Sequence, residues 1–329
     1  MRQGAVKRLD NPRPRGAPPH VQLWVFSYLG KRALDKVAQL KYTSSNRSKF
    51  MKILIVSYDN CYNGLNLSGH TVDYYSGSKY SHSDRIAELS TEYDLVINNS
   101  PWITTPSNGV GNTPASARLE THKWETRLKA QELGFLLPEV LEECDMDSVS
   151  TDYTETVFLK SKEGFRASAY KIDPSRDDIV WHNSQFPANI SGYVEKDLNH
   201  DIEGGCIFTM REGSYQIVKT QGYTSKGEEK RLAGSTDWKD DNGGVGSLTS
   251  AQETLLLDAC TTWLDYAATL GGTYEGEICT GIKGTDIYWF EQNSRRGTHG
   301  TLVGSGQDWL DSLTTDVTKA SAISWDFNF

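Results

Sequence analysis

Residues 275–301 read EGEICTGIKGTDIYWFEQNSRRGTHGT, and this stretch decides the fold. Its pattern predicts two β-strands, residues 273–279 and 286–292, joined as a hairpin. Side chains alternate between the two faces of a strand. We therefore expect Glu277 on the first strand and Glu291 at the end of the second to point into one site.

Acidic and amide side chains on that face suit a divalent cation. Glu277, Glu291 and Asn293 offer two carboxylates and a carboxamide oxygen, which are hard ligands of the kind that Mg²⁺ prefers, with Mn²⁺ as an alternative. Arg295 adds a planar donor suited to a phosphate or a developing oxyanion. For any single glutamate, an exposed hairpin face with ordinary charges is the simpler interpretation. The set as a whole favours a metal site.

Composition limits the class of protein. The chain has 329 residues, 37% of them hydrophobic, which favours two domains with a sizeable core. No apolar run approaches the ~18 residues that span a bilayer, so no membrane contact is expected. The 5 cysteines stand singly, without a CxxC pair. This spacing disfavours a disulfide framework or a structural zinc site and fits a reducing, cytoplasmic location.

Charge divides the chain unevenly. Residues 1–50 carry 11 Lys or Arg against only Asp10 and Asp35, whereas the net charge of the whole chain is -9. This basic, Pro- and Gly-containing extension is expected to be disordered, either as an organelle transit peptide or as leader sequence before a start at Met51. The acidic remainder disfavours a nucleic-acid groove, so nucleic acid is expected only as a modified nucleotide substrate.

From Met51 onward the sequence predicts a small parallel α/β domain. Strands are expected at residues 53–57, 71–75 and 94–97, with a helix at residues 83–89. The third strand delivers Asn98 to a loop at its carboxyl end, where ligands gather in such sheets. Asn98 is therefore a candidate substrate contact, and simple turn formation is the alternative.

The rest of the chain has α+β character. One helix is expected at residues 117–133, stopped by Gly134, and a long helix at residues 249–270. Strands lie before and after the long helix, and residues 225–246 form a polar, glycine-rich loop of the kind that is usually functional.

The order of several short motifs resembles the ATP-grasp ligases. E-x-N-x-R at residues 291–295 ends a late strand, and the acidic Glu277 lies on the strand before it, as in that superfamily. Lys123 followed by GFLLP at residues 134–138 is similar to the family's helix and "GIPxP" segment, whose lysine reaches the nucleotide phosphates. The resemblance therefore implies that Lys123 binds the nucleotide.

Two further motifs extend the resemblance. VFLKSKEG at residues 157–164 is similar to the strand that carries a second phosphate-binding lysine, here Lys160, and to a lid loop, although it has one glycine where relatives have several. GYVEKDL at residues 192–198 resembles the hinge strand, where the backbone of Lys196 and Asp197 would hydrogen-bond adenine. The nucleotide-binding residues implied by this strand are Glu195, Lys196, Asp197 and Leu198.

The resemblance also implies the domain organisation. A basic, disordered extension at residues 1–50 would precede a small parallel α/β, pre-ATP-grasp domain at residues 51–115. A two-lobed ATP-grasp domain would follow at residues 116–329, with its lid at about residues 150–192. The fold class is thus α/β followed by α+β.

Within the superfamily, the chain is most similar to phosphoribosylamine–glycine ligase. A Lys-Arg pair ending at Arg231 precedes NGGVG at residues 242–246, and an NxRxG ending at residues 293–297 is followed by THGT in place of the acidic part. The amino-terminal strand lacks that enzyme's Gly-Gly-Arg-Glu-His signature, and its carboxyl-terminal domain is absent. The resemblance implies catalytic roles for Arg295, Lys160 and Arg231. It implies substrate contacts by Gly243, Gly244, Arg296 and His299, with a plain loop position as the alternative for His299.

The activity that the resemblance implies is ADP-forming synthesis of an amide. A carboxylate attacks the γ-phosphate of ATP, an acyl phosphate forms, and an amine displaces phosphate, with Mg²⁺ held by the hairpin. Two alternatives remain: a ligase that joins an amino acid to a different amine, such as a modified nucleotide or a peptide, and an ATP-grasp-shaped binding protein without catalysis. The partners are small carboxylates and amines, and the sequence specifies no oligomeric state.

Overall fold

The computed structural model places residues 50–329 in one compact unit. It describes residues 50–57, 62, 65, 67, 69–76, 83–150, 152–163, 169–172, 190–223, 248–295, 301–303, 306–314 and 326–328. The extension expected at residues 1–50 lies outside the described residues apart from Phe50. None of the helices in the described part of the chain is long and apolar enough to cross a membrane.

The first sheet is parallel, as expected. Its strand order is β2-β1-β3-β4, from Thr71–Ser76, Lys52–Ser57, Leu95–Asn99 and Gly109–Gly111. The central strand β1 is a run of β-branched and aliphatic residues that is buried on both sides, which is typical of a strand inside a parallel sheet. Helix α2 (Ser83–Ser90) contributes Ile86 to the cluster on one face.

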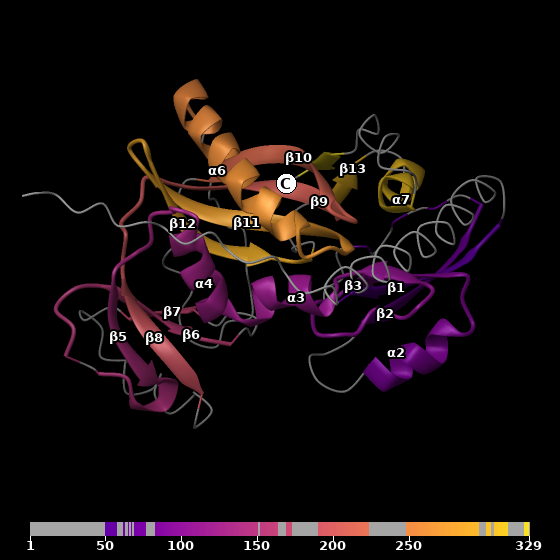
Figure 1. Ribbon diagram of the computed structural model, residues 1–329, viewed down its shortest axis with the longest axis horizontal. Coiled ribbons are helices and arrows are strands. Elements are labelled where there is room, and N and C mark those ends of the chain that lie inside the picture. The colour runs from indigo at the N-terminus through magenta and orange to yellow at the C-terminus, as the bar shows by residue number, and fades with distance from the viewer. Residues whose placement is uncertain are drawn as a thin grey trace, which may run out of the picture. The chain divides into compact units, whose positions relative to one another are not determined.

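The second sheet is antiparallel and forms the body of the site. It has the order β10-β9-β11-β12, from Ser214–Tyr223, Ile202–Arg211, Thr273–Lys283 and Asp286–Asn293. Strands β11 and β12 are the predicted hairpin, which is thus confirmed. Helix α6 (Ser250–Ala268) packs across one face of this sheet (Figure 1), and its start is fixed by a capping box between Thr249 and Gln252.

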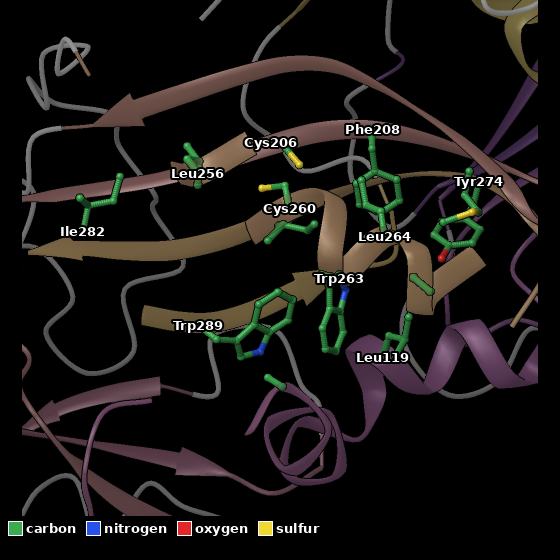
Figure 2. Close-up of a cluster of buried hydrophobic side chains, with 14 residues drawn as sticks. Leu119, Cys206, Phe208, Leu256, Cys260, Trp263, Leu264, Tyr274, Ile282 and Trp289 are labelled. Atoms are coloured by element: carbon green, nitrogen blue, oxygen red, sulfur yellow. The ribbon is translucent and has the colours of Figure 1, made fainter. Parts of the chain in front are cut away.

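The core between α6 and the sheet is rich in aromatic side chains. Trp263 of α6 and Trp289 of β12 are fully buried, with ring centroids 4.0 Å apart (Figure 2). Phe135 meets both rings edge-on. Since such pairs add to the hydrophobic gain from burial, they hold β12 firmly against α6. The opposite face of the sheet is left for polar side chains.

A third sheet, with the order β5-β8-β6-β7, includes the region predicted as the lid and is called the lid below. Its strands are Val140–Asp145, Ser191–Lys196, Val157–Ser161 and Ala169–Ile172, and the short helix η1 (Met146–Ser148) follows β5. All its pairings are antiparallel. The sequence analysis did not predict β5, because Glu142, Glu143 and Asp145 interrupt its apolar pattern and none of its residues is fully buried.

The helix expected at residues 117–133 is wrong in one respect, because the structure has two helices. Helix α3 (Pro114–Thr121) begins with a capping box formed by Thr113 and Ser116 and ends at His122, whose φ of -123° and ψ of 70° are not helical. Helix α4 (Lys123–Glu132) begins at the next residue. Both helices contact β12, so the chain changes direction at His122 while it stays on the central sheet. The remaining elements are β13 (Thr301–Val303), α7 (Gly306–Thr314) and β14 (Asp326–Asn328).

Candidate functional site

The face of the central sheet away from α6 carries the predicted acidic set. In the register of β11 and β12, Glu277 lies opposite Asn293 and Cys279 lies opposite Glu291. Directly paired residues of an antiparallel sheet share a face, so these four side chains lie together. The amide of Asn293 lies 3.8 Å from the sulfur of Cys279. The sequence prediction of a common face for Glu277, Glu291 and Asn293 is therefore confirmed as geometry.

Lys123, at the start of α4, reaches this face. Its Nζ donates to Glu291 Oε2 at 2.6 Å, and the two side chains are 17% and 35% exposed. Lys123 was expected at the nucleotide phosphates and Glu291 at a metal ion. The structure thus brings a predicted phosphate ligand and a predicted metal ligand into one ion pair.

In the lid, a second lysine pairs with a second glutamate. Lys160 of β6 contacts one oxygen of Glu195 of β8, and Arg127 of α4 donates to the other at 2.8 Å. The Glu195 side chain is only 3% exposed. Burial, and then the charge of Glu195, raise the pKa of Tyr193, which therefore stays neutral. The cluster accordingly carries two positive charges and one negative charge.

The hinge residues differ in part from the prediction. The amide of Lys196 donates to the carbonyl of Glu139 at 2.9 Å, and that of Asp197 to the carbonyl of Thr156 at 3.3 Å. These two N–H groups, predicted to reach adenine, are used within the protein. The Leu198 amide donates to no backbone carbonyl in the described part of the chain.

An aromatic side chain and a histidine, neither of them predicted, lie beside the hinge. Phe290 sits at a bulge in β12, and a Cβ on Gly281 would lie 2.4 Å from its ring and 3.0 Å from Leu198. The Lys160 ammonium lies 5.5 Å from the centroid of the Phe290 ring. His200 packs edge-on against the same ring at 5.3 Å, and both its ring nitrogens are buried without a hydrogen-bond partner among the described residues.

Orphaned buried nitrogens are rare in native proteins. A flat heteroaromatic ligand with hydroxyl groups would contact Phe290 through its ring and could satisfy His200, so these residues fit a nucleoside. The sequence gives no signal for Phe290, because a bulge that turns its side chain is invisible in the strand pattern.

Arg295 follows β12 and is held by a carboxylate that the sequence analysis missed. Its Nε donates to Glu120 Oε1 at 2.8 Å, and the amide of Ser294 donates to Glu120 Oε2 at 2.8 Å. Burial raises the pKa of Glu120 and the charge of Glu291 adds to this, whereas Arg295 and Lys123 oppose it. The Arg295 guanidinium lies 5.7 Å from the centroid of the Trp102 ring.

Glu275 lies further down the same strand and has partners of its own. Tyr62 Oη donates to one of its oxygens at 2.7 Å and Trp309 Nε1 to the other at 2.5 Å. These two rings lie 5.2 Å apart, and Glu275 is 2% exposed. Glu275 therefore joins the central sheet to α7 instead of adding to the open acidic set.

The substrate role expected for Asn98 is corrected by the structure. Asn98 is 1% exposed. Its amide donates to Ile103 O at 2.7 Å and to Thr105 Oγ1 at 3.0 Å, and its Oδ1 accepts from the amide of Ser100. These hydrogen bonds hold the side chain within the loop that follows β3, so Asn98 fits the turn-forming alternative.

The remaining predicted residues lie outside the described part of the chain. They are Arg231, Gly243, Gly244, Arg296 and His299. Within the described part, no cluster of three or more His, Cys, Asp or Glu side chains forms a metal site by itself. A metal at Glu277 and Glu291 would need the oxygen of Asn293 as well as water or phosphate oxygens to complete its shell.

Solved structures share this architecture. A carboxyaminoimidazole ribonucleotide synthase from Aspergillus clavatus, complexed with ATP, matches with a TM-score of 0.55 and 13% identity over 76% of this chain and 72% of its own. An N5-carboxyaminoimidazole synthetase from Staphylococcus aureus, complexed with ADP, matches with a TM-score of 0.56 and 10% identity over 86% and 81%. The chain has the ATP-grasp fold.

A phosphoribosylamine–glycine ligase from Thermotoga maritima is also similar to this chain, with a TM-score of 0.53 and 12% identity over 80% of this chain and 74% of its own. No protein-family model and no curated protein matches the sequence. The mixed fold class, a parallel sheet followed by antiparallel sheets, is thereby confirmed.

Proposed function

We propose that the protein is an ATP-dependent ligase that joins a carboxylate to an amine and releases ADP. The observation that carries the proposal is the pairing of Glu277 with Asn293 and of Cys279 with Glu291 on one sheet face, with Lys123 in contact with that face. In an ATP-grasp fold, such a set suits the phosphate end of a nucleotide.

The nucleoside end of the site would lie at the hinge. Phe290 offers a ring face and Leu198 a backbone N–H, and His200 offers two ring nitrogens that have no hydrogen-bond partner among the described residues. Lys160, whose ammonium lies beside Phe290, is placed to bind a phosphate that follows the nucleoside. These contacts support ATP as the co-substrate.

Glu277, Glu291 and Asn293 would hold Mg²⁺, or Mn²⁺, because their oxygens are hard donors on one face. The divalent ion, when bound, supplies charge neutralisation at the phosphate oxygens. Lys123 would then leave Glu291 for a phosphate oxygen, and Arg295 would steady the phosphoryl group as it is transferred.

The chemistry needs no covalent intermediate on the protein. A substrate carboxylate oxygen forms a bond to the γ-phosphorus and ADP leaves, which gives an acyl phosphate. The amine then attacks the acyl carbon, phosphate leaves, and the nitrogen loses a proton. The protein contributes positioning and fixed charges, which are the main sources of catalysis in such reactions.

The substrate pair is the finer part of the proposal. A phosphoribosylamine–glycine ligase is among the similar structures, and so are enzymes with other substrates. A ligase acting on a different amine, such as a modified nucleotide or a peptide, is the second candidate, since the amino-terminal strand lacks the phosphosugar signature. A binding protein without catalysis is disfavoured, because the chain has all four residues expected at the metal and phosphate end of the site: Glu277, Glu291, Asn293 and Arg295.

The test is to incubate the full chain with ATP, Mg²⁺ and pools of amino acids and amines, and to follow ADP release that depends on both substrates. Binding of Mg-ATP is measured separately by thermal unfolding. At about 100 times Kd, the nucleotide should stabilise the protein by ~2.7 kcal/mol. A folded protein whose unfolding is indifferent to millimolar Mg-ATP would contradict the proposal, and binding without turnover would favour the inactive alternative.

A further inference from the structure

We propose that Glu120 is a positioning residue that fixes the guanidinium of Arg295 and thereby sets how strongly the site distinguishes a nucleoside triphosphate from a diphosphate. The inference rests on the proposed function, in which Arg295 acts on the transferring phosphoryl group. It assigns a role to a helical carboxylate that has none in the motifs of the sequence.

The contacts of Glu120 fix a plane. One oxygen accepts from Arg295 Nε and the other from the amide of Ser294, both at 2.8 Å, and the side chain is 5% exposed. Nε is coplanar with the two terminal nitrogens of a guanidinium. A bond at Nε therefore sets the plane in which the terminal nitrogens lie, and Trp102, at 5.7 Å from the guanidinium, restrains the same group.

Ser294, one of the two partners of this carboxylate, is anchored by buried hydrogen bonds. Ser294 Oγ donates to Ser116 O at 3.1 Å and accepts from Gln292, and the carbonyl of Ser294 accepts from Asn112 at 2.6 Å. Glu120 itself stands on α3, whose first turn is closed by a capping box. A network in which the members are satisfied is rigid, so Glu120 and the backbone before Arg295 cannot shift independently.

The negative charge of Glu120 has a second role, which concerns the acidic face of the sheet. Glu291 is close enough to act on Glu120 and is itself paired with Lys123 at 2.6 Å. Arg295 follows Asn293 of the acidic face by two positions, and Glu120 gives its guanidinium a counter-charge that does not belong to that face. Glu120 thus keeps Arg295 from neutralising the residues proposed to hold the metal.

The experiment compares Kd values of Mg-ADP and of Mg²⁺ with the non-hydrolysable analogue AMP-PNP, by calorimetry on the full chain. The wild type should bind the triphosphate analogue at least about 10-fold more tightly, as expected for one charge-assisted contact of ~1.4 kcal/mol or more. Glu120→Gln and Arg295→Gln should each bring this ratio close to one, and the double variant should lower it no further, because the two residues act as one unit.

Two additional variants separate positioning from stability. Cys260→Ala removes a fully buried sulfur from the core behind the sheet and should lower the melting temperature while keeping the wild-type ratio. Glu120→Asp keeps the charge but shortens the reach to Nε, and it should give a reduced ratio. If Glu120→Gln does not fold, Glu120→Asp takes its place in the comparison.

The outcomes are distinct. A wild type that binds neither nucleotide overturns the proposed function and this inference together. A wild type that binds both nucleotides equally, an Arg295→Gln variant with an unchanged ratio, or Glu120 variants with the wild-type ratio beside a defective Arg295→Gln each overturn the inference alone. Additive losses in the double variant also overturn it, since they would show that Glu120 acts apart from Arg295.

Discussion

The central sheet and the lid each contain one lysine–glutamate pair, and the two pairs are built differently. On the sheet, Lys123 and Glu291 are 17% and 35% exposed and lie beside a further carboxylate, Glu277. In the lid, Glu195 is 3% exposed and has two cationic partners, Lys160 and Arg127. Among these residues, the carboxylates outnumber the cation at the sheet pair, whereas the cations outnumber the carboxylate at the lid pair.

The difference indicates which pair can open. A partly exposed ion pair contributes little to stability, so Glu291 can exchange Lys123 for a divalent ion at small cost. A buried carboxylate between two cations cannot be removed without leaving those cations uncompensated. We infer that Glu195 is a fixed element of the lid, whereas Glu291 is the exchangeable one.

The largest effect on stability is expected from Glu195→Gln. The amide leaves Lys160 and Arg127 without their shared counter-charge, and the free energy of unfolding should fall by about 3–5 kcal/mol. Urea denaturation measures it. The matched control is Glu143→Gln, which breaks the exposed lid pair with Lys162 and should change stability by less than ~1 kcal/mol. Equal midpoints for the two variants would show that Glu195 is not a fixed element.

The next effect separates chemistry from folding at the sheet pair. Glu291→Gln should lower substrate-dependent ADP release by about 100-fold or more, since it removes a carboxylate proposed to hold the divalent ion. The same change should lower apo stability by no more than ~1 kcal/mol, because the pair with Lys123 is partly exposed. Glu125→Gln, which breaks the exposed contact with Arg118, is the control for both the activity and the stability measurement. Near-normal turnover in Glu291→Gln would contradict the proposal that Glu291 holds the metal ion.

A third carboxylate sharpens the comparison, because the described contacts of Glu275 come from neutral donors. Tyr62→Phe deletes the hydroxyl that donates to Glu275 at 2.7 Å and leaves Trp309 in place. A hydrogen bond to a charged group contributes about 1.5–3 kcal/mol, so a loss in this range is expected by urea denaturation. Tyr74→Phe, which deletes a half-exposed hydroxyl bound to Leu65 O, should cost far less. If the two variants lose a similar amount of unfolding free energy, the hydrogen bond from Tyr62 to Glu275 does not anchor the structure.

The smallest effect is expected far from both pairs. Removing residues 1–50 should leave the melting temperature and the affinity for Mg-ATP nearly unchanged, because the first buried strand begins at Lys52 and Phe50 is 64% exposed. Differential scanning calorimetry and nucleotide titration of the shortened protein check this. A drop of more than a few degrees would show that the extension docks on the body.

The sequence predicted the site best where a local period governs the structure. Alternation along the hairpin is enough to put Glu277 and Glu291 on one face, and the buried run of β1 is enough to predict a parallel strand. Glu120 could not be found in this way, since a glutamate in a helix has the pattern of a solvent-facing residue until Ser294 and Arg295 are brought to it from 174 and 175 positions away.

The same reason explains the other differences. The break at His122 depends on backbone angles that no composition signal marks, and it was missed for that reason. The sequence alone does not decide the role of Asn98, because a polar residue after a strand suits both a ligand contact and a turn. The sequence indicates which chemistry is present, and the tertiary contacts decide which residues are free to perform it.

The closely packed indoles of Trp263 and Trp289 give the molecule an optical reporter. Two such chromophores with centroids 4.0 Å apart and planes inclined by 35° couple their electronic transitions, which produces a pair of circular-dichroism bands of opposite sign. Both rings lie on the α6 side of the sheet, away from the acidic face. Their signal should therefore persist through ligand exchange and vanish only when α6 separates from β12.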